Sequence, residues 1–233
     1  MLLSDRGILD ALKGPDGLVI RPYKREQLQP ASYDVTLGNK IQIPFSGSLT
    51  SHQMEPLSIR PYESLGSDSF TSHDLNSDLC IVRQERVSNW ASVRFWSGPY
   101  RDIMGPFTHG IWLKPNEFIL GSTEEYVEIP AYLASRLNGK STLGRWGLTV
   151  HVTAGFIDPG FCGNITLEIK NEGPFNILLE PGMRIGQLDF QLLDKQPAQV
   201  YKGKYQGQTG AEPPKPTVDA VLATLNEETS EID

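Results

Sequence analysis

Short apolar stretches separated by turn-forming residues follow one another along most of the chain. The first lie at 18–20, 33–37 and 41–43, and each is bounded by Gly, Pro, Asn or Asp. The pattern continues through 22 Gly and 17 Pro in 233 residues. Closely spaced short strands with turn signals between them are typical of sandwiches and barrels. We therefore predict a mainly β fold.

The strand pattern is clearest after Gly110. Further strands are predicted at 111–113, 118–121, 126–129, 148–153, 164–170, 175–179 and 187–192. Turn-forming sequences separate several of them: Lys-Pro-Asn at 114–116, Asp-Pro-Gly at 158–160 and Glu-Pro-Gly at 180–182.

A short helix is predicted within the first dozen residues. Ser4 is a suitable N-cap, because its side-chain oxygen can accept a hydrogen bond from the first turn. Ile8, Leu9 and Leu12 then share one face before a Gly-Pro pair at 14–15 ends the helix. A second helix is predicted at 131–137.

The prediction at 131–137 depends on the spacing of two leucines. Leu133 and Leu137 lie four residues apart, which places them on one face of a helix. Pro130 precedes the segment, and proline is favoured in the first turn of a helix.

The length and the pattern together indicate one domain with a tail. We expect a single β domain over 1–202, with an elaboration at about 45–107 where no period is strong. The segment 203–233 begins rich in Gly, Gln and Pro and ends acidic. We expect it to be a flexible tail with a brief helix at 218–225, and we find no internal repeat.

The overall composition excludes several classes of protein. Hydrophobic residues make up 39% and charged residues 21%, and no apolar run approaches the length of a membrane span. The net charge of -7 disfavours broad binding to nucleic acid or to anionic membranes. The first residues carry an acidic group within their apolar stretch, so no secretory signal is expected. A local basic pocket for a small anion stays possible.

The cysteines and histidines predict neither a disulfide framework nor a bound zinc ion. Cys80 and Cys162 could form one bridge, but two reduced, buried thiols in the cytoplasm are the favoured interpretation. None of the four histidines has a second ligand at zinc spacing: His52, His73, His109 and His151.

Candidate phosphate-binding residues lie in the sequence GKSTLGR at 139–145. Lys140, Ser141 and Arg145 offer hydrogen-bond donors and positive charge among glycines, as a phosphate requires. A Walker motif does not fit, because Ala134 stands where its first glycine would be. An ordinary tight turn with solvated Lys and Arg side chains is the alternative.

A candidate carboxylate lies in the predicted strand at 164–170. Alternation places Ile165, Leu167 and Ile169 on one face and Glu168 on the other. On a solvated outer face Glu168 would have no special role, whereas on a concave inner face it could transfer protons. Asp158 lies in a Pro-Gly turn, where an aspartate is usually only a turn former.

The sequence VYKGKYQGQTGA at 200–211 contains side chains that can bind a polar ligand. Tyr201, Lys204, Tyr205 and Gln208 lie among glycines that loosen the backbone. The segment is either a disordered terminus or a mobile cover that closes over a bound anion.

Taken in order, these sequences resemble the dCTP deaminase family of the dUTPase-like superfamily. The resemblance covers most of the chain except about 45–107 and the last residues. It rests on PASYDVTLGNK (30–40), PNEFILGSTEEYVEIP (115–130), GKSTLGR, HVTAGFIDPGF, ITLEI, EPGMRIGQL and GKYQGQTG. It implies a distorted β-barrel or jelly-roll, assembled as a homotrimer with active sites at the subunit boundaries.

The resemblance also implies a zinc-independent deamination of dCTP. Glu168 matches the glutamate that takes a proton from the attacking water and helps ammonia leave. Ser141 and Arg145 match residues that position this water and the triphosphate, with Lys140 nearby. Thr142 replaces the more usual second serine of this motif and keeps a hydroxyl group.

Further substrate contacts follow from the same resemblance. Asp158 matches the aspartate that binds the 3′-hydroxyl of the deoxyribose, and the backbone around Ala154 faces the base. Thr166 and Leu167 belong to the strand that contacts the base.

The tail and the metal complete the implied site. Tyr201, Lys204 and Gln208 match tail residues that close over the phosphates. A Mg²⁺ ion is expected to be held by the phosphate oxygens and not by protein side chains.

Within this resemblance, three residues favour a second reaction, the release of diphosphate to give dUMP. Members that only deaminate tend to carry a His-Arg pair after the alanine of HVTA, whereas this chain has Gly155 and Phe156. Gln187 also matches the bifunctional members. Gly155 could leave space for a water beside the α-phosphate, and Asp158 matches the aspartate near the attacking water in dUTPases.

Three alternatives stay open at this point. They are a deaminase that stops at dUTP, a plain dUTPase and a nucleotide-sensing protein without turnover. The resemblance further implies inhibition by dTTP, and the two reduced thiols indicate a location in the cytoplasm.

Overall fold

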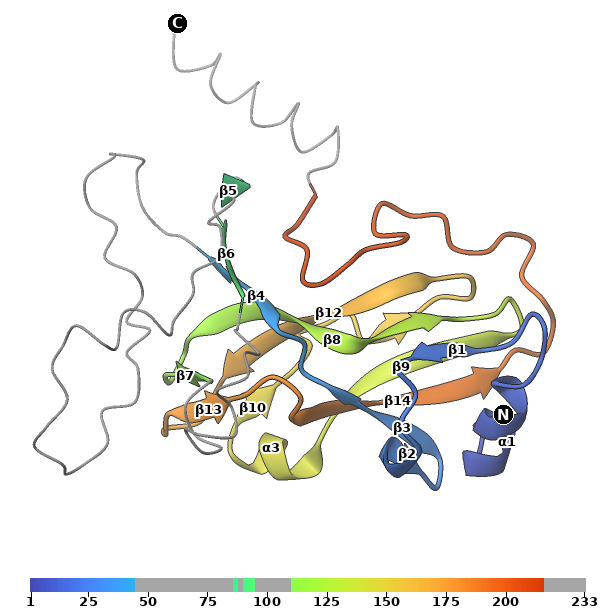
Figure 1. Cartoon of the computed structure of the whole chain (residues 1–233), viewed down its shortest axis with the longest axis horizontal. Helices are drawn as coiled ribbons and strands as arrows, with labels where there is room; N and C mark the ends of the chain where they lie inside the picture. The colour runs from blue at the N-terminus through green and yellow to red at the C-terminus, as the bar shows by residue number, and fades with distance from the viewer. Residues whose placement is uncertain (45–85, 88–89, 95–109, 216–233) are drawn as a thin grey trace, which may run out of the picture.

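The computed structural model describes residues 1–44, 86–87, 90–94 and 110–215 (Figure 1). The helical elements are α1 (Asp5–Ala11), the 3-10 turn η1 (Arg25–Gln27) and α3 (Ser141–Arg145). The first strands are β1 (Val19–Arg21), β2 (Leu28–Gln29), β3 (Ser32–Thr36), β4 (Lys40–Pro44), β5 (Arg86–Val87) and β6 (Trp90–Arg94). The later strands are β7 (Ile111–Leu113), β8 (Phe118–Glu128), β9 (Leu133–Gly139), β10 (Leu148–Thr149), β11 (Phe156–Ile157), β12 (Cys162–Asn171), β13 (Ile177–Leu179) and β14 (Arg184–Leu192).

Two large sheets form the described part of the molecule, which confirms the prediction of a mainly β fold. The first has the order β10-β12-β8-β4-β6-β5, with β1 also paired to β8, and the second has the order β11-β9-β14-β3-β2. β13 and β7 form a separate two-stranded sheet. Within the described residues the sheets stay open and do not close into a barrel, so a distorted jelly-roll describes the fold better. Figure 1 shows β12 and β8 in one layer and β9, β14 and β3 in the other.

The antiparallel pair of β12 and β8 is the longest ladder of the first sheet. It runs from Cys162 opposite Glu128 to Lys170 opposite Phe118. β8 is one continuous strand of 11 residues, where the sequence pattern predicted two short ones. The polar residues between the two predicted strands stay inside the sheet because they find partners there. The Thr123 hydroxyl, for example, donates to the main-chain oxygen of Glu125 at 2.7 Å.

The hydrophobic core contains residues from both sheets. Leu167 and Ile169 of β12 and Leu188 and Phe190 of β14 are fully buried and belong to the same cluster. Burying one such side chain stabilises the fold by about 1.5–3 kcal/mol. A slip of β12 by one residue would expose all of its inward side chains, so the core determines which face Glu168 occupies.

The N-terminal helix is confirmed by α1. The Gly7 main-chain nitrogen donates to the Ser4 side-chain oxygen at 3.5 Å, as expected for an N-cap. Ile8 is completely buried, and Leu9 and Leu12 pack against the core as the common face predicted.

The helix predicted at 131–137 is wrong, because this segment forms strand β9. Leu133 and Leu137 are both buried, but residues four apart also share one face of a strand. The residue between them on that face is Ser135, whose hydroxyl donates to the main-chain oxygen of Asp189 at 2.7 Å. β9 pairs with β14 over its whole length, which satisfies the hydrogen-bonding groups of its backbone. This pairing decides in favour of the strand over the helix.

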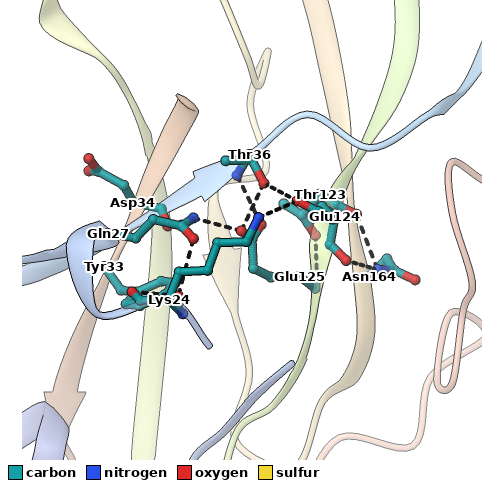
Figure 2. Close-up of polar contacts among 9 residues, drawn as sticks. All are labelled: Lys24, Gln27, Tyr33, Asp34, Thr36, Thr123, Glu124, Glu125 and Asn164. Atoms are coloured by element: carbon teal, nitrogen blue, oxygen red, sulfur yellow. Dashed lines mark hydrogen bonds and ion pairs between the residues drawn. The ribbon is translucent and has the colours of Figure 1, made fainter. Parts of the chain in front are cut away.

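A buried polar cluster joins the first strands to β8 (Figure 2). The Glu125 carboxylate is fully buried and accepts hydrogen bonds from the Gln27 side chain at 2.7 Å and from the Thr36 main-chain nitrogen at 2.9 Å. The Tyr33 hydroxyl accepts a hydrogen bond from the Lys24 main-chain nitrogen at 2.7 Å. Burial raises the pKa of Tyr33 to about 12. The contact between Thr36 and Glu125 joins β3 to β8.

Neighbouring Glu124 is less buried and has a cation partner. Its carboxylate accepts from the Lys24 ammonium and from the Thr36 hydroxyl, each at 2.9 Å. Partial burial by itself would raise the pKa of Glu124, but these two hydrogen bonds outweigh it and lower the pKa.

Some predictions fall on residues beyond the described ranges. The helix at 218–225, Cys80 and most of the elaboration at 45–107 lie outside them. Cys162 is a free thiol and is half-buried instead of buried. Its hydrogen bond with Tyr126 raises the pKa of that tyrosine. In the part of the chain that the structure describes, no helix is long and apolar enough to span a membrane.

Candidate active site

Strand β12 presents Glu168 on the face opposite to the core. Its neighbours Leu167 and Ile169 are fully buried, so the period of the strand directs Glu168 outward from the core. The main-chain nitrogen of Val152 donates to Glu168 Oε2 at 2.7 Å, and the main-chain nitrogen of Glu168 donates to Val150 at 3.1 Å. The carboxylate is therefore held in place by the segment after β10 and does not extend freely into solvent.

Glu168 lines a cavity of about 260 Å³. Six of the predicted site residues line it: Ala154, Asp158, Thr166, Glu168, Tyr201 and Gln208. The remaining lining residues are mostly apolar or aromatic: Leu120, Phe156, Ile157, Phe161, Ile165, Tyr205, Glu212 and Pro214. A largely apolar cavity with a few polar groups is the usual form of a small-molecule site.

Three segments build the walls of this cavity. β12 contributes Thr166 and Glu168, and the segment from Ala154 to Asp158 passes beside it. The tail closes the other side, where the Tyr201 ring packs 5.9 Å from the ring of Phe161. The sequence pattern alone could not bring these segments together, since they lie up to about 50 residues apart.

The predicted phosphate-binding residues lie elsewhere on the chain. Ser141, Thr142 and Arg145 belong to α3, are exposed and do not line the cavity. Lys140 forms an ion pair of 2.7 Å with the buried carboxylate of Asp34. Within one copy of the chain, the candidate phosphate-binding residues therefore lie outside the cavity that contains Glu168, the candidate proton-transfer residue.

Three further predicted residues are also outside the cavity. The Leu167 side chain is completely buried in the core, so only its main chain can face a ligand. Gln187 lies on β14, where its side-chain oxygen accepts a hydrogen bond from Ser32 at 3.2 Å. Lys204 is exposed, and its ammonium donates to the main-chain oxygen of Lys215 at 2.6 Å.

The tail is attached to β12 at a β-bulge. The register between β12 and β8 shifts between Asn164 and Thr166, and Gly163 forms a parallel bridge with Gln208. Asn164 accepts from the Gln208 side chain at 2.6 Å through its main-chain oxygen and from the Gly210 main-chain nitrogen at 3.1 Å through its side chain. The Asn164 amide also donates to two main-chain oxygens of β8. The bulge is thus the point where the tail joins the sheet.

Sequence reasoning missed several of these residues. Asn164 and Asp34 were not singled out, because their contacts join segments 46 and 106 residues apart. Glu212 and Pro214 line the cavity but lie beyond the part of the tail that the motif covered. No local signal could have identified them.

The chain also matches known proteins over nearly its whole length. A family model described as dCTP deaminase-like matches residues 2–193. The chain belongs to the dCTP deaminase-like family. Membership confirms the resemblance found in the sequence.

Curated relatives support the assignment to the dCTP deaminase-like family. The chain is 50% identical to a "dCTP deaminase, dUMP-forming" of Parafrankia sp., with 97% of this chain and 96% of the relative covered. It is 39% identical to a protein of the same name from Corynebacterium glutamicum, with 92% and 96% covered. A third protein of that name, from Coprothermobacter proteolyticus, is 36% identical, with 91% and 94% covered.

The solved structures to which the chain is similar are more distant. The crystal structure of a 2′-deoxycytidine 5′-triphosphate deaminase from Agrobacterium tumefaciens is 22% identical, with a TM-score of 0.48, 82% of this chain covered and 48% of that chain. A dUTPase of EIAV is 24% identical, with a TM-score of 0.34, 41% of this chain covered and 78% of that chain.

Proposed function

We propose that this chain deaminates dCTP hydrolytically and releases diphosphate, so that the product is dUMP. The observation that carries the proposal is the Glu168 carboxylate, anchored by one main-chain N–H inside a largely apolar cavity. The cavity offers flat apolar walls for a base and polar groups at Thr166 and Asp158. The curated relatives named for this activity support the same conclusion.

The proposed deamination uses Glu168 to move protons. Glu168 takes a proton from a water while the water oxygen bonds to C4 of the cytosine. The electron pair of the C4=N3 bond moves to N3 as the water adds. The proton held by Glu168 passes to the amino nitrogen, the C4–N4 bond breaks and ammonia leaves, and the second proton of the water ends on N3 of uracil. Because Oε2 already accepts from the Val152 main-chain nitrogen, we assign the water to Oε1.

Diphosphate release requires a second water. This water attacks the α-phosphorus, the bond to the bridging oxygen breaks, and diphosphate leaves with dUMP as the other product. Asp158 lines the cavity and is proposed to bind the 3′-hydroxyl and lie near this water. Gly155 packs so closely that an added Cβ would lie 2.9 Å from the main-chain oxygen of Leu137, so glycine keeps this loop tight against β9.

A homotrimer would complete the site. Ser141, Thr142 and Arg145 are exposed on α3 and do not reach the cavity of their own chain. We propose that α3 of one subunit supplies them to the cavity of its neighbour, where they position the water and the triphosphate. Lys204 would then have to leave Lys215 to reach the phosphates. Tyr201 and Gln208 already line the cavity from the tail.

Mg²⁺ fits this proposal as an ion that comes with the nucleotide. Among the residues that the structure describes, no group of three or more His, Cys, Asp or Glu side chains could hold a metal. Phosphate oxygens and water are the ligands that Mg²⁺ usually keeps in nucleotide sites. When bound, the ion would reduce the charge of the triphosphate. The independence from zinc, inhibition by dTTP and a cytoplasmic location stay predictions.

The test is to follow dCTP to its products in oxygen-18 water with Mg²⁺. We expect ammonia, dUMP and diphosphate, with one labelled oxygen at C4 of uracil and one on the phosphate of dUMP, because the second water attacks the α-phosphorus. Accumulation of dUTP alone would limit the activity to deamination. Turnover of dUTP without turnover of dCTP would show a plain dUTPase and refute the proposal.

A further inference from the structure

Asp34 is a buried carboxylate that contacts two cations, one at the start of α3 and one in β14. It lies in β3 and is 1% exposed. Its Oδ1 accepts from the Lys140 ammonium at 2.7 Å, and its Oδ2 lies 3.5 Å from Nη1 of Arg184. A charge in the interior is costly unless it is paired, so Asp34 depends on these partners.

The main chain of Asp34 is held by the 3-10 turn η1. Its main-chain oxygen accepts from the Gln27 side chain at 2.9 Å, and the same Gln27 amide donates to Glu125. Figure 2 shows the Asp34 carboxylate pointing away from Glu125 and the rest of that cluster. The carboxylate is therefore a rigid point on the sheet that is available to other segments.

Lys140 connects this rigid point to α3. It is the N-cap of the helix, and its main-chain oxygen accepts from the Gly144 main-chain nitrogen at 2.9 Å. None of the five residues of α3 is buried, although Leu143 packs partly against the core. The ion pair with Asp34 is thus a strong constraint on where the exposed helix begins.

Arg184 is held independently of Lys140. Its Nη2 donates to the main-chain oxygen of Glu26 at 2.9 Å, so Arg184 stays beside Asp34 whatever Lys140 does. Arg184 thus helps to fix the carboxylate with which Lys140 pairs.

We propose that Asp34 is the positioning residue of the phosphate-binding turn. It holds Lys140, and through it Ser141 and Arg145, in the orientation that receives a triphosphate. Lys140 stays paired with Asp34, and Arg184 holds the Asp34 carboxylate in place from β14. The inference rests on the proposed function, because it takes the triphosphate of that reaction as the ligand.

The test compares binding of dCTP and of deoxycytidine, which lacks phosphates, by calorimetry. Glu168→Gln serves as background so that dCTP is not consumed. Asp34→Asn is expected to weaken dCTP binding by about tenfold to a hundredfold, the range for losing a charged hydrogen-bond partner, and to leave deoxycytidine binding unchanged. In the otherwise native protein, KM should rise more than kcat falls. Asp16→Asn, at an exposed aspartate, is the matched control.

Two further variants separate positioning from mere stability. Lys140→Gln should have the effect of Asp34→Asn, and the double variant should be no worse than either one. Asp34→Glu keeps the charge and should restore part of the affinity. Additive losses, or equal losses for dCTP and deoxycytidine, would overturn the inference.

Arg184→Gln keeps the inference testable if Asp34→Asn does not fold. It should weaken dCTP binding while thermal unfolding stays cooperative, because the Asp34 carboxylate that holds Lys140 then loses its second cationic partner. Unchanged dCTP binding would refute the role of Arg184. If the native protein did not convert dCTP, the proposed function would fail, and binding of inorganic tripolyphosphate to the same variants would still test the role of Asp34.

Discussion

The cavity wall at Glu168 and the turn at α3 are built in opposite ways. Glu168 lies in a ten-residue strand paired with β8, and its carboxylate accepts from a main-chain N–H. α3 has five residues, none of them buried, and its Ser141 and Arg145 are exposed. The group proposed to transfer protons is thus fixed by the sheet itself. The groups proposed to bind the triphosphate depend on one ion pair, between Lys140 and Asp34, and in our proposal on a contact with a neighbouring subunit.

This difference follows from what each task requires. Proton transfer needs a carboxylate within hydrogen-bond distance of one atom, so small displacements are costly. Attraction of a triphosphate falls off slowly with distance, so its donors can tolerate more freedom. We therefore expect activity to be more sensitive to changes at Glu168 than to changes in α3.

The largest effect is expected at the rigid wall. Glu168→Gln removes the proton acceptor but keeps the shape, so ammonia release should fall by about 10²- to 10⁴-fold. Binding of dCTP should change little, and both quantities can be measured on the same protein. Glu172→Gln, on an exposed residue just beyond β12, is the control. Normal ammonia release by Glu168→Gln would show that the wall does not supply the base.

The next effect tests whether α3 acts on another subunit. Glu168→Gln and Arg145→Ala should each be inactive in a homotrimer. After the two are mixed and reassembled, about one quarter of the shared sites would combine an intact Glu168 with an intact Arg145, and activity should return to that extent. The rate is measured after dissociation and reassembly, with each variant alone as reference. No recovery would place both regions in the site of one chain.

A smaller effect is expected where the tail meets the wall. Asn164→Ala removes three side-chain hydrogen bonds, two to β8 and one to Gly210 of the tail. The KM for dCTP should rise by about tenfold, as expected for the loss of roughly 1.4 kcal/mol of closure. The tail should also be cleaved faster by trypsin. Asn176→Ala, at an exposed position before β13, should change neither property.

The smallest effect concerns the stability of the fold at Tyr33 in β3. The pKa of Tyr33 is about 12 in the folded chain against 10.0 ordinarily, so the protonated form favours folding. This contribution is complete below pH 10 and is lost as the pH rises through 12. Tyr33→Phe should lower the free energy of unfolding by about 1–3 kcal/mol at pH 8, because the Lys24 main-chain nitrogen loses its acceptor.

Denaturant unfolding at several pH values checks the Tyr33 prediction. Native protein should lose stability between pH 10 and 12 more steeply than Tyr33→Phe. Parallel curves would mean that Tyr33 does not keep its proton in the folded chain. Activity at pH 8 should be nearly equal in the two proteins.

The local sequence predicted the structure correctly wherever only one hydrophobic period, that of a helix or that of a strand, fitted a segment. The alternation of β12 predicted the face of Glu168, and Ser4 with its apolar face predicted α1. The same reasoning failed at 131–137, because a spacing of four residues fits a helix and a strand equally well. The same reasoning predicted two strands where β8 is continuous. Polar residues such as Thr123 are typical of turns, and only their hydrogen-bond partners in the fold show that they lie inside a strand.

Sequence by itself determined the mainly β fold, the family and the types of residue that bear the chemistry. Only the tertiary structure decided that Glu168 meets the tail in one cavity, that Asn164 receives that tail, and that Lys140 is held by Asp34. The reason is physical. Periodicity and capping act between neighbours in the chain, whereas a cavity or a buried ion pair forms between segments whose distance along the chain carries no information about their distance in space.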